Sequence, residues 1–170
     1  MSELRSNAPD LSPVPSSPRV RVHTSRFGDI DVEIGRAIKI PGGLLGFPDS
    51  VRFALLEPDQ DSPFWWLQSL DDGELAFVVT DPMAFFPDYR VDARAEELEA
   101  LGIVDPVDLD VLVILSLRGS IESMTANLQG PILLNAKTRV GRQFVLKDSG
   151  YQTRHPLFPE FDEPLAGPAE

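Results

Sequence analysis

The sequence predicts a mainly β protein, an antiparallel single domain that is barrel-like or a sandwich, with one short α-helix. Three observations predict this class. Many short segments have the length and apolar content of strands, turn residues separate them, and one segment has helical spacing. Short strands divided by turns, with almost no helix between them, are typical of antiparallel barrels and sandwiches.

The first elements form a predicted hairpin. Apolar residues occupy every second position in two successive segments, at Val20 and Val22 and then at Ile30, Val32 and Ile34. This period of two is typical of strands with one buried face. Phe27, Gly28 and Asp29 lie between the two segments and supply a hairpin turn.

Eight further strands are expected along the chain. They comprise residues 37–40, 52–56, 64–70, 75–80, 109–117, 124–128, 132–135 and 142–146. Turns are expected at 41–43, 71–73 and 140–141, where glycine is present. One helix is predicted, with Asp92 as its cap, Ala95, Leu98 and Leu101 on one face, and Gly102 at its end.

Composition and charge restrict the function. Residues 19–157 are expected to form the domain, between a flexible arm at 1–18 and a flexible tail at 158–170, both rich in proline. The chain has no cysteine, no recognisable signal segment and no long apolar run, so we expect a cytoplasmic protein that does not contact membranes. A net charge of -12 opposes direct nucleic-acid binding and suits a basic protein partner.

No constellation for catalysis is apparent. His23 and His155 are isolated, and the three glycines at 42, 43 and 46 lack the strand and helix of a phosphate loop. Adjacent carboxylates such as Glu96 and Glu97 are typical of a solvated surface. We therefore expect no enzyme activity, no metal, no cofactor and no small-molecule substrate.

The segment 63–89 is the most distinctive. It holds both tryptophans, and Trp65 and Trp66 are neighbours on one predicted strand, so one should face the interior and the other should face outward. Residues 85–89, Phe-Phe-Pro-Asp-Tyr, follow Pro82 in a predicted loop. Aromatic rings are hard to bury in a loop, so these are candidates for anchoring a protein partner.

Several motifs in one order resemble the flagellar assembly factor FliW family. They are Phe-Gly-Asp-Ile at 27–30, Pro-Gly-Gly-Leu-Leu-Gly-Phe at 41–47, Pro-Phe-Trp-Trp-Leu-Gln-Ser at 63–69, Leu-Ala-Phe-Val-Val-Thr-Asp-Pro at 75–82, Phe-Pro-Asp-Tyr at 86–89, Met-Thr-Ala-Asn-Leu at 124–128, Gly-Pro-Ile at 130–132 and Tyr-Gln-Thr-Arg-His-Pro-Leu at 151–157. Gln129-Gly130 departs slightly from the more apolar pair expected there. The resemblance covers about residues 20–157.

The resemblance implies a partner switch in the cytoplasm. Proteins of this kind bind flagellin and also bind CsrA, a small basic repressor of flagellin translation, so that FliW freed by flagellin secretion sequesters CsrA. On physical grounds, the candidate partner-binding residues are Phe85, Phe86, Asp88, Tyr89, Asp92, Glu96, Glu97, Met124 and Asn127. An alternative is a small-ligand-binding barrel whose interior is lined by Trp65 or Trp66 with Phe77, which an interior filled by side chains would oppose. A hydrolase would need a nucleophile–base pair, which the sequence does not display.

Overall fold

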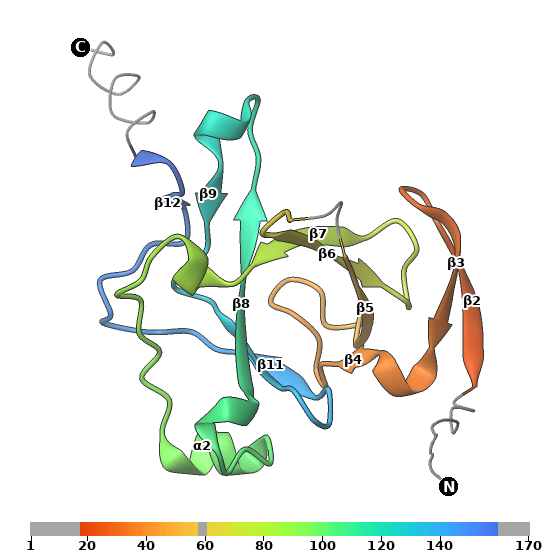
Figure 1. Ribbon diagram of the computed structural model, residues 1–170, viewed down its shortest axis with the longest axis horizontal. Coiled ribbons are helices and arrows are strands. Elements are labelled where there is room, and N and C mark those ends of the chain that lie inside the picture. The colour runs from red at the N-terminus through yellow and green to blue at the C-terminus, as the bar shows by residue number, and fades with distance from the viewer. Residues whose placement is uncertain (1–17, 58–60, 160–170) are drawn as a thin grey trace, which may run out of the picture.

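A computed structural model describes residues 18–57 and 61–159 (Figure 1). Most of the expected arm and tail lies outside these residues. The strands are β2 (Arg19–Thr24), β3 (Gly28–Glu33), β4 (Ile38–Lys39), β5 (Arg52–Leu56), β6 (Phe64–Ser69), β7 (Ala76–Thr80), β8 (Leu109–Ser116), β9 (Thr125–Ala126), β10 (Ile132–Asn135), β11 (Gly141–Gln143) and β12 (His155–Pro156). The helical elements are α2 (Ala95–Ala100) and the 3-10 turns η1 (Ile34–Arg36), η2 (Pro82–Ala84), η3 (Pro106–Asp108) and η4 (Ile121–Ser123).

The main sheet curls into a barrel-like form. Its strand order is β11-β10-β8-β7-β6-β5-β4, and each neighbouring pair is antiparallel. At the two ends of this order, a single parallel bridge joins Lys39 to Val140, and the Lys39 N–H donates to Arg139 O at 2.9 Å. One bridge is not a full ladder, so the sheet is not a closed barrel. The predicted fold class, mainly β with one short α-helix, is confirmed.

Side chains fill the inside of this curled sheet. Ile38, Phe53, Leu67, Val79 and Ile132 come from five strands, and each is at most 1% exposed. The alternation along each strand brings these residues to one face, where they form a common core. An interior packed in this way opposes the alternative of a ligand enclosed within the barrel.

A second core lies on the other face of β8. Val113 and Leu115 pack there with Ala126 of β9 and with Leu146 and Leu157 of the C-terminal segment. Strand β8 is long enough to pair with β10 near its start and with β9 near its end, while its other edge pairs with β7. The segment 85–91 and the C-terminal residues therefore cover a face that would otherwise be exposed.

The β2–β3 hairpin forms a separate two-stranded sheet beside the barrel (Figure 1). Its apolar residues Val22, Ile30 and Val32 pack against the outer face of β5. The contact at Gly73 is close: a Cβ there would lie 2.0 Å from His23 O. Only glycine fits this position without moving the hairpin or the turn between β6 and β7.

The two tryptophans take opposite faces, as predicted from their adjacent positions on β6. Trp65 packs against the interior core. Trp66 lies outside, where the Phe27 ring meets it edge-on at 5.5 Å between centroids and the Arg26 guanidinium lies 4.4 Å from its ring centroid. The hairpin turn therefore covers the outward tryptophan.

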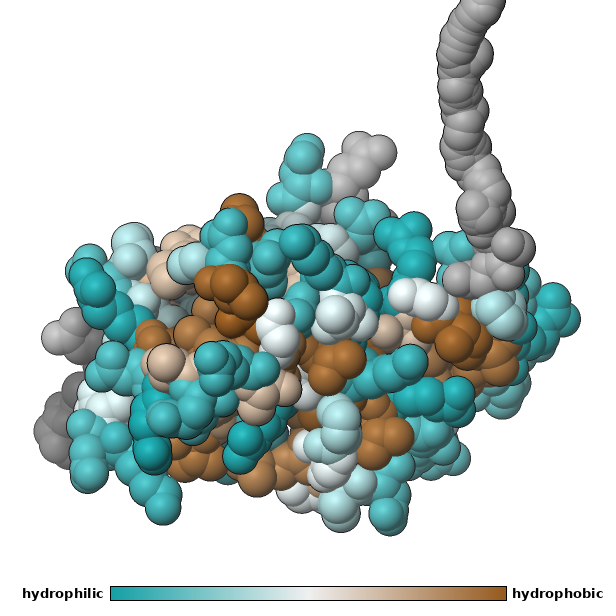
Figure 2. All heavy atoms as spheres, turned by 90° about the horizontal axis from the view of Figure 1, so that it is seen from below, coloured by the Kyte–Doolittle hydropathy of each residue, from teal (hydrophilic) through white to brown (hydrophobic). Residues whose placement is uncertain are grey.

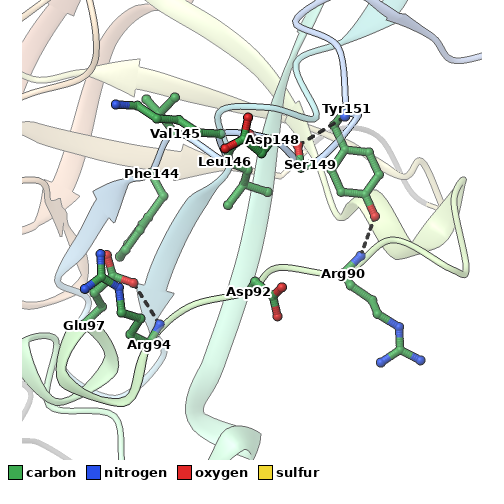
Figure 3. A pocket seen from close by; sticks show the side chains of 11 residues that line it. Arg90, Asp92, Arg94, Glu97, Phe144, Val145, Leu146, Asp148, Ser149 and Tyr151 are labelled. Carbon is green, nitrogen blue, oxygen red and sulfur yellow. Dashed lines mark hydrogen bonds between the residues drawn. The ribbon is translucent and has the colours of Figure 1, made fainter.

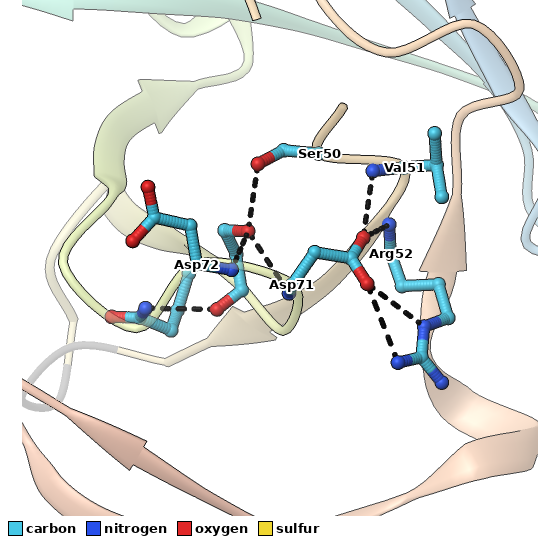
Figure 4. A network of polar contacts seen from close by, with 7 residues as sticks. Ser50, Val51, Arg52, Asp71 and Asp72 are labelled. Carbon is cyan, nitrogen blue, oxygen red and sulfur yellow. Dashed lines mark hydrogen bonds and ion pairs between the residues drawn. The ribbon is translucent and has the colours of Figure 1, made fainter. Parts of the chain in front are cut away.

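A carboxylate joins the start of β5 to the turn after β6 (Figure 4). Asp71 accepts hydrogen bonds from the N–H groups of Val51 and Arg52 at 2.8 and 2.9 Å, and its other oxygen lies 3.3 Å from the Arg52 guanidinium. Burial by itself would raise the pKa of Asp71, but the two backbone N–H groups and the Arg52 charge together lower it. The side chain therefore favours its ionised form.

Several predicted boundaries were wrong. The strands expected at 37–40 and 124–128 shorten to β4 and β9, and the strand expected at 142–146 becomes β11, which begins one residue earlier and ends at Gln143. The regular ladders cover only these residues, and single backbone hydrogen bonds continue beyond them. Ile34 lies in a 3-10 turn, Gly141 lies in β11, and β12 was not predicted. The last turn instead involves Arg139, which has a φ of 65°.

The predicted helix begins later than expected. Arg94, not Asp92, is the residue at its N-terminal cap, and Gly102 ends it with a φ of 73° as predicted. At the C-terminal boundary, Phe158 packs against the second core, so this residue belongs with the domain.

Candidate partner-binding surfaces

The rings of the 85–89 loop turn toward the second core. Phe85 stacks on Phe64 with 5.7 Å between centroids and meets Phe158 edge-on at 5.9 Å. Phe86 meets the His155 ring edge-on at 5.1 Å. Both phenylalanines are half-buried, so much of their surface serves packing and only the remainder faces solvent.

Two of the predicted contact residues lie in the core. Tyr89 is 2% exposed and Met124 is 5% exposed, so neither side chain is presented to a partner, contrary to expectation. The Tyr89 hydroxyl donates to Leu128 O at 2.6 Å. Burial, and secondarily Tyr151, raises the pKa of Tyr89, so the hydroxyl stays protonated and keeps donating. Sequence reasoning missed this burial because it depends on the C-terminal segment folding over the loop.

Asn127 has a local structural role. Its Oδ1 accepts the Gly130 N–H at 2.9 Å, and its own N–H donates to Ile114 O at 2.9 Å. A Cβ at Gly130 would lie 2.9 Å from the Asn127 side-chain amide nitrogen, so a larger residue there would have to displace this amide. The half-buried asparagine shapes the turn that follows β9.

Three of the four predicted acidic residues are exposed, and the fourth, Glu97, is half-buried and caps the helix. Asp88, Asp92 and Glu96 are exposed. Glu97 is half-buried, and its carboxylate accepts the Arg94 N–H at 2.8 Å, which satisfies a free donor at the start of α2. Glu97 therefore stabilises the helix terminus, and the other three carboxylates are available to a partner.

A hollow of about 470 Å³ brings part of this acidic segment beside the C-terminal segment (Figure 3). Its lining includes Asp92 and Glu97 from one side and Phe144, Lys147 and Asp148 from the other. The two segments are tied where the Arg90 N–H donates to the Tyr151 hydroxyl at 3.0 Å. Mixed charges around an apolar floor suit contact with a polar protein surface.

A larger hollow of about 750 Å³ lies at one end of the barrel. Its apolar lining includes Trp65, Leu112 and Leu134, and Arg36 and Arg139 lie on its rim. Sequence reasoning identified Trp65 as an interior candidate but not this hollow, because its residues come from separate segments spread between Arg36 and Arg139. Figure 2 shows that apolar side chains reach the face seen from below in patches separated by hydrophilic ones.

Residues 18–57 and 61–159 offer neither a cluster of metal ligands nor a helix that could span a membrane. These residues contain no cluster of three or more histidine, aspartate or glutamate side chains placed to hold a metal ion. None of their helices is long and apolar enough to cross a membrane.

The family model described as FliW protein matches residues 21–157. The chain belongs to the FliW family. It is 44% identical over 139 residues to the flagellar assembly factor FliW of Geobacter sulfurreducens, covering 82% of this chain and 87% of that protein. It is 39% identical over 140 residues to that of Natranaerobius thermophilus, covering 82% and 93%.

A solved structure supports the same relationship. A crystal structure of the flagellar assembly factor FliW superposes with a TM-score of 0.76 at 35% sequence identity, covering 82% of this chain and 98% of that one. Likeness in both sequence and fold over the whole domain makes this chain a member of a flagellar assembly factor family, as the motifs in the sequence predicted.

Proposed function

We propose that this protein binds flagellin and CsrA, and that holding CsrA relieves the repression of flagellin translation. Membership of the FliW family supports the flagellar role. In the scheme that the resemblance implies, CsrA is a small basic protein, and flagellin and CsrA are held at different times. No chemistry is required of the protein, which acts as a cytoplasmic switch between partners.

One observation carries the proposal for the basic partner. Four exposed carboxylates, those of Asp88, Asp92, Glu96 and Glu99, lie within twelve successive positions that run from the 85–89 loop into α2, with the exposed Arg90 and Arg94 between them. Among the described residues, none of the four makes an ion pair. Together they form the acidic α2 surface. Carboxylates without internal partners attract a basic protein at long range and speed its encounter.

Charge reversal tests this surface. The variant Asp92→Lys/Glu96→Lys should slow CsrA association about tenfold or more at low salt, because surface charge chiefly steers encounter. The matched control is Glu74→Lys/Glu122→Lys, which changes the net charge equally at two exposed sites away from α2. Association and dissociation rates measured at two salt concentrations would separate steering from direct contact.

The outcomes are distinct. Slowing confined to the α2 variant supports the acidic α2 surface as the CsrA side. Equal slowing in both variants would mean that only net charge matters, and CsrA binding unaffected by either variant would contradict the electrostatic argument. Binding of the flagellin leader RNA by the purified protein alone would contradict the proposal as a whole.

A further inference from the structure

The larger hollow is the mouth of the barrel. Strands β5 and β7 end there, and β6 and β8 begin there. Arg139, which lies next to the single bridge between Lys39 and Val140, also lines the hollow. Trp65, Leu112 and Leu134 form its floor, continuous with the interior core. Met83 stands at its edge with 48% of its surface exposed. A flexible thioether beside an aromatic floor adapts readily to different apolar side chains.

The hollow extends into a second one of about 240 Å³. Four residues line both: Arg36, Leu55, Leu56 and Arg139. The two hollows together form an elongated depression that runs from the barrel mouth toward β3, and we call it the mouth groove. Its length and its two compartments fit a chain segment with side chains in both compartments, whereas a compact small molecule would fill only one.

Two arginines lie where the compartments meet. Arg139 Nε donates to Arg36 O at 3.2 Å, which holds the two residues together. Within the described residues, neither guanidinium makes an ion pair. Two guanidinium groups without an ion pair, beside an apolar floor, are complementary to a carboxylate.

Carboxylates of the protein itself surround the larger compartment. Glu57, Asp81 and Asp110 are exposed on its rim. They would repel a strongly acidic segment and attract lysine or arginine on either side of a central acid. The groove is therefore complementary to an amphipathic segment of mixed charge, with bulky apolar side chains and at least one carboxylate.

We infer that the mouth groove binds an amphipathic segment of flagellin, with a carboxylate between Arg36 and Arg139 and an apolar side chain against Trp65. This inference rests on the proposed function and specifies the site for one of its two partners. It places flagellin away from the half-buried 85–89 loop. It also leaves the acidic α2 surface to the basic partner.

The test combines charge reversal with fluorescence. The variant Arg36→Glu/Arg139→Glu should weaken the binding of full-length flagellin at least tenfold. Its matched control is Arg118→Glu/Arg154→Glu, two exposed arginines near the far end of β8 and near β12. In a Trp66→Phe background Trp65 is the remaining tryptophan, so its emission should shift when flagellin or a peptide of a flagellin terminal segment binds. Circular dichroism would check that each variant is folded.

Each result decides a different point. The inference is supported if flagellin binding weakens only in the groove variant and Trp65 emission shifts on binding. A peptide whose acidic residue is replaced by lysine should then restore binding to the groove variant. Full binding by the groove variant, or loss only in the Arg118/Arg154 variant, overturns it and favours the 85–89 side. Failure of the unmodified protein to bind flagellin overturns the proposed function with it. A small molecule retained in the groove, detected by native mass spectrometry, would overturn the inference in favour of a ligand-binding barrel.

Discussion

Replacing Tyr89 by phenylalanine tests whether this residue stabilises the core or contacts a partner. The change removes one oxygen and leaves the ring. In the structure that hydroxyl donates to Leu128 O at 2.6 Å, and both residues are at most 2% exposed. Among the described hydrogen bonds, Leu128 O accepts from no other donor. The substitution therefore leaves a buried carbonyl without a partner.

The expected magnitude follows from that carbonyl. An unpaired buried acceptor costs about 1–3 kcal/mol of the free energy of unfolding. For a domain of this size, that lowers the melting temperature by roughly 3–10 °C. Because burial raises the pKa of Tyr89 above its unfolded value, the contribution is present in full at neutral pH and is lost only as the pH rises beyond about 10.

Thermal and urea unfolding would measure the loss, and titration with flagellin and with CsrA would measure affinity. Tyr151→Phe is the matched control, because its half-buried hydroxyl accepts from the exposed Arg90 backbone, so its loss should cost less. Tyr89→Phe should lower stability and leave the affinity of the folded protein unchanged. An unchanged melting temperature together with weaker partner binding would refute the assignment of Tyr89 to the core.

Two further substitutions test how the outer elements are held. Gly73→Ala should destabilise the protein by about 1–3 kcal/mol, because the new Cβ collides with His23 O and displaces the hairpin. Displacing the hairpin uncovers Trp66, so its emission should shift to the red, and unchanged emission would contradict this. Asp71→Asn should cost about 1 kcal/mol at pH 7. Folding lowers the pKa of Asp71, so its contribution to the free energy of unfolding is present above about pH 4 and is lost as the pH falls through the lowered pKa. The urea midpoint of the variant should therefore depend less on pH in the acid range than that of the unmodified protein.

Local patterns in the sequence were enough to predict the class of fold. Alternation placed Val20 and Val22 on one face of a hairpin, and adjacency on a strand placed Trp65 and Trp66 on opposite faces. A period of two depends only on backbone geometry, so it is visible in the sequence of one strand. Gly102 likewise marked the end of α2, because a positive φ favours glycine wherever it occurs.

The family was also recognisable from the sequence, because its motifs are short, local and in a fixed order. Glu96 was expected at the solvated surface and is exposed, and Asp88 and Asp92 are exposed as well, since charged side chains are rarely buried without a partner. Whether they contact CsrA stays a prediction.

Only the tertiary structure decided which aromatic residues are buried and where a groove exists. Tyr89 looked exposed in its own segment, but Leu128 and the C-terminal residues enclose it. The mouth groove brings Arg36 and Arg139 together across 103 positions of the chain. Such sites are set by how the sheet curls and which ends meet, and these depend on contacts between distant residues, which no local period encodes.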